Sequence, residues 1–441
     1  MKHSRYNIFF EHDGHKLIFN SLTSVFAVAD GKFMNLYNKI DTIKESELEE
    51  DNKKRLEAME KSGYIINEDF NELYYIEFMY QKSKYDSEYL KLTIMPTYSC
   101  NFACPYCYEG NYDNRKTNLM MTTEVEDAIA ELCENYAKKG KKIRITWYGG
   151  EPLLVKNSIW SLSKKINDIC DKYKTKSLAY MITNGYLIDE STVNKMKESR
   201  IEGVQICFDG PPDLHNKSRK LKNSSKGTFD TLLNNLKMLK AGGIKVAMRV
   251  HATKENETRV KELLEIFAKE NLNDCLVSIA PIRNYASECS KQFDLFLDVK
   301  EFSKKELEYI VDILKLGFKA TIYPLPQIIQ HCVATSEHAY MIGPDGNLFG
   351  CWTDAGKPGK EIGNIFELIK KEKEKDQSID NSYYLKNILY TPLKDKECAD
   401  CNILPLCMGT CVTLKTCPTL KYNLFDVLKF EYDRRKKKVI V

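Results

Sequence analysis

The sequence lacks any run of 18 or more apolar residues, the length that a membrane-spanning helix needs. It also lacks the uninterrupted apolar stretch of a signal peptide, because Glu11 and Asp13 break the short run at the N-terminus. We therefore expect a cytoplasmic protein with no membrane partner.

The chain has no excess of charge of either sign. Its 441 residues include 66 Lys and Arg against 62 Asp and Glu, a formal net charge of +4. This balance provides no general attraction for nucleic acid, so we expect no nucleic-acid partner. Repeats and low-complexity segments are absent, and the 43% hydrophobic content excludes wholesale disorder.

What the sequence does contain is 15 cysteines. A reducing cytoplasm does not maintain structural disulfides, so clustered cysteines there more often bind metal or carry out chemistry. Their spacing therefore holds most of the functional information.

Between residues 91 and 282, short β-branched or aromatic runs alternate with longer stretches of helical periodicity. The predicted strands are 91–97, 142–148, 178–184, 203–209, 245–252 and 275–282. Six βα units in series predict an α/β fold with a parallel sheet, either curled into a barrel or open and doubly wound. In both, the chemistry belongs at the C-terminal ends of the strands.

The two ends of the chain have different patterns. Residues 1–85 predict a small α+β region, with strands around 6–10, 15–20 and 64–67 and helices at 32–43 and 48–62. Residues 325–441 are rich in Cys, Pro and Gly and have few long periodic segments, which indicates a domain held by something other than a large core.

The loop after the first of the six strands carries the pattern C-x3-C-x2-C, formed by Cys100, Cys104 and Cys107. Three thiolates this close together can hold three irons of a cubane cluster and leave the fourth iron open to another ligand. The alternative is a zinc knuckle with a distant fourth ligand.

A glycine pair follows the next strand, in the sequence Trp147-Tyr148-Gly149-Gly150-Glu151-Pro152. The two glycines allow a ligand to approach the backbone closely, and Glu151 adds a carboxylate suited to an ammonium group. By itself this sequence predicts only a turn.

Together, C-x3-C-x2-C with the aromatic Tyr106 before its last cysteine, and GGEP after the second strand, resemble the radical S-adenosylmethionine (SAM) superfamily. The resemblance implies a partial (β/α)6 barrel over residues 90–320. It also implies a 4Fe–4S cluster on Cys100, Cys104 and Cys107, whose open iron takes the amino and carboxyl groups of SAM. Reductive cleavage would then yield a 5′-deoxyadenosyl radical that abstracts hydrogen, and an electron donor such as ferredoxin or flavodoxin would be a partner.

Carried over by position, the resemblance implies SAM contacts at the ends of four strands. The glycine pair and Glu151 would line the methionine amino group, Asn184, Cys207 and Asp209 would lie near the ribose and carboxylate, and Arg249 is a further candidate. The alternative for Asn184-Gly185 and Asp209-Gly210 is a plain turn or loop start. The predicted SAM-site residues are Tyr106, Gly149, Gly150, Glu151, Asn184, Cys207, Asp209 and Arg249.

The last seven cysteines have the spacing Cys332-x13-Gly346-x4-Cys351, Cys398-x2-Cys401-x5-Cys407-x3-Cys411 and finally Cys417. This spacing resembles the SPASM domain, which implies two auxiliary 4Fe–4S clusters. By position, one would be held by Cys398, Cys401, Cys407 and Cys417, and the other by Cys332, Cys351 and Cys411. Two structural zinc sites are the alternative.

The second auxiliary cluster would be one ligand short. Either Cys275 or Cys289 completes it, or one iron stays open and could bind a substrate thiolate. Cys133, Cys170 and Cys207 lie inside helical or strand patterns, where a free cysteine is usually a small core residue, so none of them is expected to be a metal ligand.

Residues 1–85 resemble by pattern the winged-helix element that binds the leader of a precursor peptide as an added edge strand. The alternative is an unrelated α+β appendage. Together the resemblances imply a radical SAM/SPASM maturase that installs a crosslink, a Cys thioether, in a ribosomally synthesised precursor peptide with a leader segment.

Three other functions stay open. Related enzymes form carbon–carbon crosslinks with the same machinery. Sulfatase maturases, which form formylglycine, share the barrel and SPASM spacing, but there an Asp base follows the cysteine of G-x4-C, whereas Trp352 stands here and Asp354 comes two positions later. A non-catalytic iron–sulfur or zinc protein would not cleave SAM at all.

Overall fold

The computed structural model describes residues 1–43, 48–85, 88–109, 118–283, 295–320, 323–374 and 381–437. The chain forms two compact units, which are described separately. The larger unit comprises Ser87–Ala320 and His331–Leu389, and the smaller comprises Met1–Asp86, Thr321–Gln330 and Tyr390–Val439. Cys289 lies outside the described residues.

A nine-stranded sheet in the order β11-β10-β9-β8-β7-β6-β12-β13-β14 forms the centre of the larger unit. Its first six strands are all parallel and confirm the six predicted runs. They are β6 (Tyr89–Ile94), β7 (Lys142–Trp147), β8 (Ser177–Thr183), β9 (Ile201–Phe208), β10 (Lys245–Ala252) and β11 (Leu276–Pro281).

These six strands are neighbours in their chain order, as in a barrel, whereas a doubly wound sheet reverses its order at the first strand. The sheet does not close on β11, because β6 pairs on its other side with β12. The predicted partial (β/α)6 barrel is therefore confirmed, and the doubly wound alternative is wrong.

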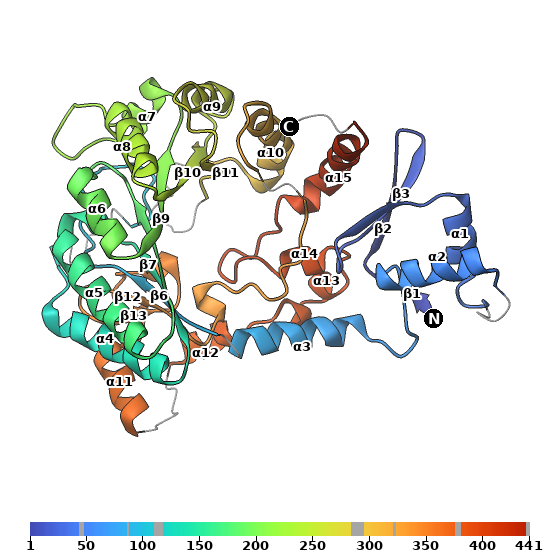
Figure 1. The fold of residues 1–441 in the computed structure, drawn as a ribbon, viewed down its shortest axis with the longest axis horizontal. Helices are drawn as coiled ribbons and strands as arrows, with labels where there is room; N and C mark the ends of the chain where they lie inside the picture. The colour runs from blue at the N-terminus through green and yellow to red at the C-terminus, as the bar shows by residue number, and fades with distance from the viewer. Residues whose placement is uncertain are drawn as a thin grey trace. The chain divides into compact units, whose positions relative to one another are not determined.

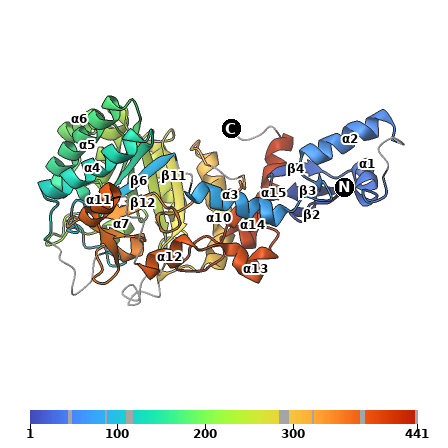
Figure 2. The ribbon, with the colours of Figure 1, turned by 90° about the horizontal axis from the view of Figure 1, so that it is seen from below.

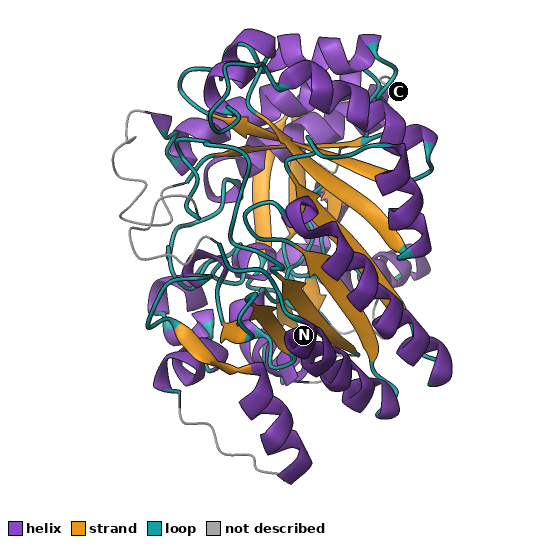
Figure 3. Cartoon of the chain, turned by 90° about the vertical axis from the view of Figure 1, so that its left-hand side faces the viewer, coloured by secondary structure: helices purple, strands orange, loops and turns teal. Residues whose placement is uncertain are grey.

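Helices cover the outer face of this sheet (Figure 3). They are α4 (Thr123–Lys138), α5 (Lys156–Lys172), α6 (Glu190–Glu198), α7 (Pro212–Ser218), α8 (Phe229–Ala241), α9 (Val260–Lys269) and α10 (Val299–Lys315), with the short η2 (Pro152–Val155) before α5. Their apolar sides and the alternate residues of the strands form one core, which includes Cys133 and Cys170 as predicted.

The strands that continue the sheet come from the Cys-rich segment. They are β12 (Ala339–Ile342), β13 (Asn347–Phe349) and β14 (Glu361–Asn364), accompanied by η4 (Val333–Thr335), η5 (Trp352–Asp354), α11 (Ile365–Glu374) and α12 (Ser382–Ile388). Because β12 is parallel to β6 in continuous register, residues 331–389 belong to the barrel unit. The structure thus divides residues 325–441 between the two units.

The smaller unit is α+β, as predicted for the N-terminal region (Figures 1 and 2). Its strands are β1 (Lys2–His3), β2 (Asn7–His12), β3 (His15–Asn20), β4 (Val25–Val28) and β5 (Ile65–Ile66). Its helices are α1 (Gly31–Asn38), α2 (Glu50–Lys61), α3 (Glu72–Tyr85), α13 (Lys396–Ala399), α14 (Leu404–Cys407) and α15 (Leu420–Lys437), with the short η6 (Pro392–Lys394).

The antiparallel sheet β2-β3-β4 of this unit is covered on both faces. Ile18 packs among residues of α1 and α2, and Phe19, its neighbour on the opposite face, packs among residues of α14 and α15. Among the described residues, no helix is long and apolar enough to cross a membrane.

Candidate active site

The three cysteines of the C-x3-C-x2-C motif lie on the loop that leaves the C-terminal end of β6. This loop is fastened to the segment after α7, because Ala103 N–H donates to Lys220 O (2.8 Å) and Lys222 N–H donates to Asn101 O (2.8 Å). The backbone N–H of Phe102 lies 3.3 Å from Cys100 Sγ. The loop therefore has a defined path, and we call residues 97–109 the cluster loop.

The thiols of this loop are half-buried, and their charges act on one another. Burial raises the pKa of Cys100 to about 12, and the charges of Glu151 and Cys104 raise it as well. Burial likewise raises the pKa values of Cys104 and Cys107. Thiolates with little access to water need cations beside them. The three cysteines therefore fit an iron–sulfur cluster in which three irons each bind one cysteine.

The loop after β7 packs directly on the cluster loop through the two glycines of GGEP. A Cβ on Gly150 would lie 2.2 Å from Ser99 O, and one on Gly149, whose φ is +113°, would lie 2.5 Å from Thr97 O. No other residue fits at either position. The glycine pair is thus required by contact between the two loops.

Glu151 joins the ends of β7 and β8. Its carboxylate accepts hydrogen bonds from Thr183 Oγ1 (2.6 Å) and from the backbone N–H groups of Asn184 (2.7 Å) and Leu153 (3.0 Å). Burial raises its pKa, while these hydrogen bonds act in the opposite direction. The carboxylate orients its own loops, and its predicted contact with a methionine amino group stays a prediction.

Asn184 lies beside Cys100, the first cysteine of the motif. Its Nδ2 donates to Asn101 Oδ1 (2.7 Å) and lies 3.8 Å from Cys100 Sγ. The end of β8 is therefore in contact with the cluster loop.

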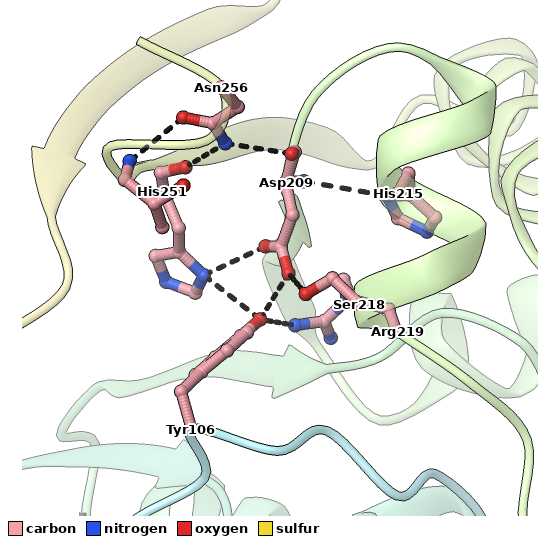
Figure 4. Close-up of polar contacts among 8 residues, drawn as sticks. Tyr106, Asp209, His215, Ser218, Arg219, His251 and Asn256 are labelled. Atoms are coloured by element: carbon pink, nitrogen blue, oxygen red, sulfur yellow. Dashed lines mark hydrogen bonds and ion pairs between the residues drawn. The ribbon is translucent and has the colours of Figure 1, made fainter. Parts of the chain in front are cut away.

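Asp209, at the end of β9, is the centre of a buried polar network (Figure 4). Tyr106 of the cluster loop and Ser218 of α7 each donate a 2.5 Å hydrogen bond to its Oδ2. His251 of β10 places Nδ1 3.1 Å from Oδ1. Asn256 Nδ2 donates to the backbone oxygens of both Asp209 and His251, at 2.7 Å each.

Charge and burial oppose each other in this network. Although burial raises the pKa of Asp209, the hydrogen bond with His251 and the charge of Arg219 hold it well below its usual range. Although burial lowers the pKa of His251, contacts with Cys207 and Asp209 raise it to about 9. An ionised Asp209 beside a protonated His251 is the consequence near neutral pH.

Arg219 completes the network from the end of α7. Its guanidinium is buried and donates a 2.9 Å hydrogen bond to the Tyr106 hydroxyl. Its charge also acts on Cys104 and lowers the pKa of that thiol against the effect of burial. A fixed cation therefore stands near the cluster loop.

The other two predicted contacts lie on adjacent strands in register. Cys207 of β9 is paired with Arg249 of β10, whose Nη1 donates to Ser278 Oγ at 3.4 Å. Burial alone raises the pKa of Cys207, but the charge and hydrogen bond of His251 lower it below its ordinary value. Cys207 thus belongs to the Asp209 network.

Sequence reasoning missed Arg219 and His251. His251 is two residues beyond Arg249 on the same strand, so it shares the face of Arg249 and lies nearer the C-terminal end. Strand alternation could have identified it. Nothing in the local sequence distinguishes Arg219 from the lysines around it.

The C-terminal cysteines are divided between the units. Cys332 and Cys351 belong to the larger unit, and Cys398, Cys401, Cys407, Cys411 and Cys417 belong to the smaller. The thiol of Cys351 lies 3.2 Å from Thr353 Oγ1, and the next residue, Trp352, has its ring 4.4 Å from that of Tyr148.

In the smaller unit, burial raises the pKa of Cys398 and raises that of Cys407 to about 11, and nearby thiols add to both shifts. Cys417 and Cys401 act on Cys398, and Cys401, Cys398 and Cys417 act on Cys407. Such a grouping fits the four-cysteine set predicted for one auxiliary cluster. Within the described ranges, no three His, Cys, Asp or Glu side chains are placed to hold a single metal ion.

Comparison with known families identifies the central part of the chain. Residues 94–267 match the Radical SAM superfamily. The chain contains a radical SAM domain. This domain includes the cluster loop, the glycine pair and the Asp209 network.

Relatives and solved structures extend the likeness beyond this domain. The cysteine-type anaerobic sulfatase-maturating enzyme of Clostridium perfringens is 24% identical over 350 residues, 73% of this chain and 88% of that protein. Two other curated relatives are matched over only 54% and 57% of their own length.

Two structures share the fold. Native anSMEcpe, with bound AdoMet and Cp18Cys peptide, has a TM-score of 0.60 and 19% identity over 78% of this chain and 99% of that one. SuiB of Streptococcus suis, bound to precursor peptide SuiA, has a TM-score of 0.53 and 16% identity over 95% of this chain and 97% of that one.

Proposed function

We propose that this radical SAM enzyme is a peptide maturase that installs a crosslink, a Cys thioether, in a ribosomally synthesised precursor peptide. The observation that carries the proposal is the three-thiol cluster loop held at the C-terminal end of a partial barrel, in a radical SAM domain. The fold likeness to a peptide-bound neighbour, with a TM-score of 0.53, supports it. When bound, the cluster with SAM supplies a 5′-deoxyadenosyl radical that abstracts hydrogen from the peptide.

The chain's own residues would prepare the site for that chemistry. Tyr106, Asp209 and Arg219 hold the cluster loop against the ends of β9 and β10, and Glu151 holds the loop after β7. The backbone of the glycine pair and the side chains of Asn184, Cys207 and Arg249 are the proposed contacts of SAM. Burial of these groups would keep water from the radical.

The same proposal extends to both ends of the chain. Residues 1–85 would bind the leader segment, since β4 pairs only with β3 among the described strands and offers an edge for an added strand. Residues 325–441 would supply the two auxiliary 4Fe–4S clusters, one of them on Cys398, Cys401, Cys407 and Cys417. A flavodoxin or ferredoxin would deliver the electron.

The experiment is an anaerobic assay of the reconstituted chain with SAM, dithionite and a small Cys-rich peptide encoded beside its gene. We expect 5′-deoxyadenosine and a peptide that has lost two hydrogen atoms per crosslink. A precursor variant without cysteines should form no crosslink. Crosslinking of that variant would contradict the thioether and support a carbon–carbon bond.

A sulfatase maturase is the second candidate, favoured by the 24% identity to the Clostridium perfringens enzyme. Formylglycine formation from cysteine replaces sulfur by oxygen and removes two hydrogen atoms, whereas a crosslink removes two hydrogen atoms only, so mass spectrometry separates the two products. The residue after Cys351 is Trp352, which cannot act as a base, and the carboxylate of Asp354 accepts a 2.5 Å hydrogen bond from Tyr383. A chain that cleaves no SAM after reduction would contradict both candidates.

A further inference from the structure

A lysine side chain lies directly on one of the C-terminal thiols. Lys421, the second residue of α15, donates a 3.3 Å hydrogen bond from Nζ to Cys401 Sγ. Its charge also interacts with Cys417 and Cys407. All of these residues belong to the smaller unit, so the contact lies within one compact body.

The surroundings add further positive potential to the same group of thiols. The 18-residue helix α15 begins at Leu420, three residues after Cys417, and a helix N-terminus carries a partial positive charge. The backbone N–H of Gly409 lies 3.4 Å from Cys407 Sγ. By contrast, the groups that donate to Cys100 in the cluster loop are a backbone N–H and a neutral amide.

We propose that Lys421 raises the reduction potential of the iron–sulfur cluster proposed for Cys398, Cys401, Cys407 and Cys417. The inference rests on the proposed function of those cysteines. Four thiolates give such a cluster negative charge, and reduction adds more. A cation bonded to one sulfur therefore stabilises the reduced form more than the oxidised form.

Lys421 acts through the sulfur atom and is not a catalytic residue, so the test measures a potential. The full chain carries Cys100→Ala, Cys104→Ala and Cys107→Ala, which removes the cluster of the barrel. After anaerobic reconstitution, iron and sulfide are counted and the reduction midpoint is determined by spectroscopic titration. The signal that disappears in Cys398→Ala identifies the site.

In this background, Lys421→Met removes the charge and keeps a chain of similar length. We expect the reduction equilibrium to fall about tenfold, which corresponds to about 59 mV for one electron. Lys421→Arg should keep most of the potential, because it keeps the cation. Lys429→Met, about two turns further along α15, is the matched control and should leave the midpoint unchanged.

The outcomes are distinguishable. An unchanged midpoint in Lys421→Met at equal iron content overturns the role of Lys421 and leaves the cluster proposal standing. Zinc without iron at these cysteines overturns the cluster proposal and this inference with it, before any potential is measured. If Lys421→Met binds no cluster, Lys421→Gln is measured instead. We expect its midpoint potential to be lower than that of the parent chain, and an unchanged midpoint overturns the inference.

Discussion

Tyr106 donates a 2.5 Å hydrogen bond to Asp209, and this contact joins the cluster loop to the end of β9. Tyr106 precedes the last cysteine of the motif, so the position of its ring also restrains Cys107. The carboxylate that the family resemblance suggested as a SAM contact thus has a structural task, which is to hold the loop that carries the thiols.

Asp209→Asn should therefore lower the rate of 5′-deoxyadenosine formation by at least about tenfold, as loss of supporting hydrogen bonds around metal sites commonly does. Tyr106→Phe should have a similar effect, because it removes the other half of the same bond. The assay is product formation with SAM and dithionite at saturating SAM.

The matched control for that prediction is Asp213→Asn, four residues further on. The Asp213 carboxylate forms an exposed 2.7 Å ion pair with Arg259, away from the buried network. Its loss should leave the rate nearly unchanged. Equal rates in all three variants and the wild type would show that the Tyr106–Asp209 bond has no role in the reaction.

The pH dependence of stability should report the protonation of His251. Although burial lowers the pKa of His251, its contacts with Cys207 and Asp209 raise it to about 9, above the ordinary 6.5. A pKa raised in the folded state stabilises that state below pH 6.5 and loses this contribution as the pH rises through about 9. We expect the free energy of unfolding of the metal-free chain to fall by up to about 3 kcal/mol over that interval.

Chemical denaturation at several pH values measures this effect. His251→Gln has no group that titrates there and should show a flatter profile. Cys207→Ser should lie between the two, because it removes one of the two partners that raise the pKa. Parallel profiles for the wild type and His251→Gln would contradict the assignment.

Gly150→Ala tests the contact between the two loops. The added methyl group would lie 2.2 Å from Ser99 O, a backbone atom that cannot move aside without displacing the cluster loop. We expect a loss of stability of about 1–3 kcal/mol and a reconstituted chain with less iron. Gly31→Ala, where the new methyl group meets no atom within 4 Å, is the control and should keep both quantities. Iron retained in full by Gly150→Ala would show that the loops can separate.

Much of the site could be predicted from the sequence because it lies at strand ends. The six strands have clear β-branched runs, and the parallel sheet brings their C-terminal ends together, so Asn184, Cys207 and Asp209 could be placed at one edge of the sheet. Their role as SAM contacts was implied by the family resemblance and stays a prediction. The motif cysteines are recognisable from spacing alone. These features depend on local sequence and on one rule of topology.

What sequence reasoning missed depends on long-range contacts. Arg219 becomes notable only because its side chain is buried against Tyr106. The continuation of the sheet by β12 is a pairing with β6, 248 residues earlier in the chain (Ala339 with Lys91), which no local pattern encodes. Helix α3 was missed because Tyr74, Tyr75 and Phe78 are exposed, and these aromatic residues obscure the apolar face.

The iron content should identify the cluster loop as a ligand set. Three 4Fe–4S clusters predict about 12 irons per chain in the reconstituted wild type, and about 8 in the variant with alanine at Cys100, Cys104 and Cys107. Metal analysis with sulfide determination measures both. Retention of all the iron in the triple variant would contradict the assignment, and about 4 irons with bound zinc in the wild type would assign the C-terminal cysteines to zinc.

Asp354 separates the two candidate functions. Its carboxylate is buried and accepts the hydrogen bond of Tyr383, which ties η5 to α12. In the peptide-crosslinking proposal this contact is structural, so Asp354→Asn and Tyr383→Phe should each lower stability by about 2 kcal/mol and still cleave SAM. In the formylglycine alternative, Asp354 would serve as the base, and only Asp354→Asn would abolish the peptide product. Mass spectrometry of the peptide treated with each variant therefore shows whether Asp354 only connects η5 to α12 or also acts as the base of the reaction.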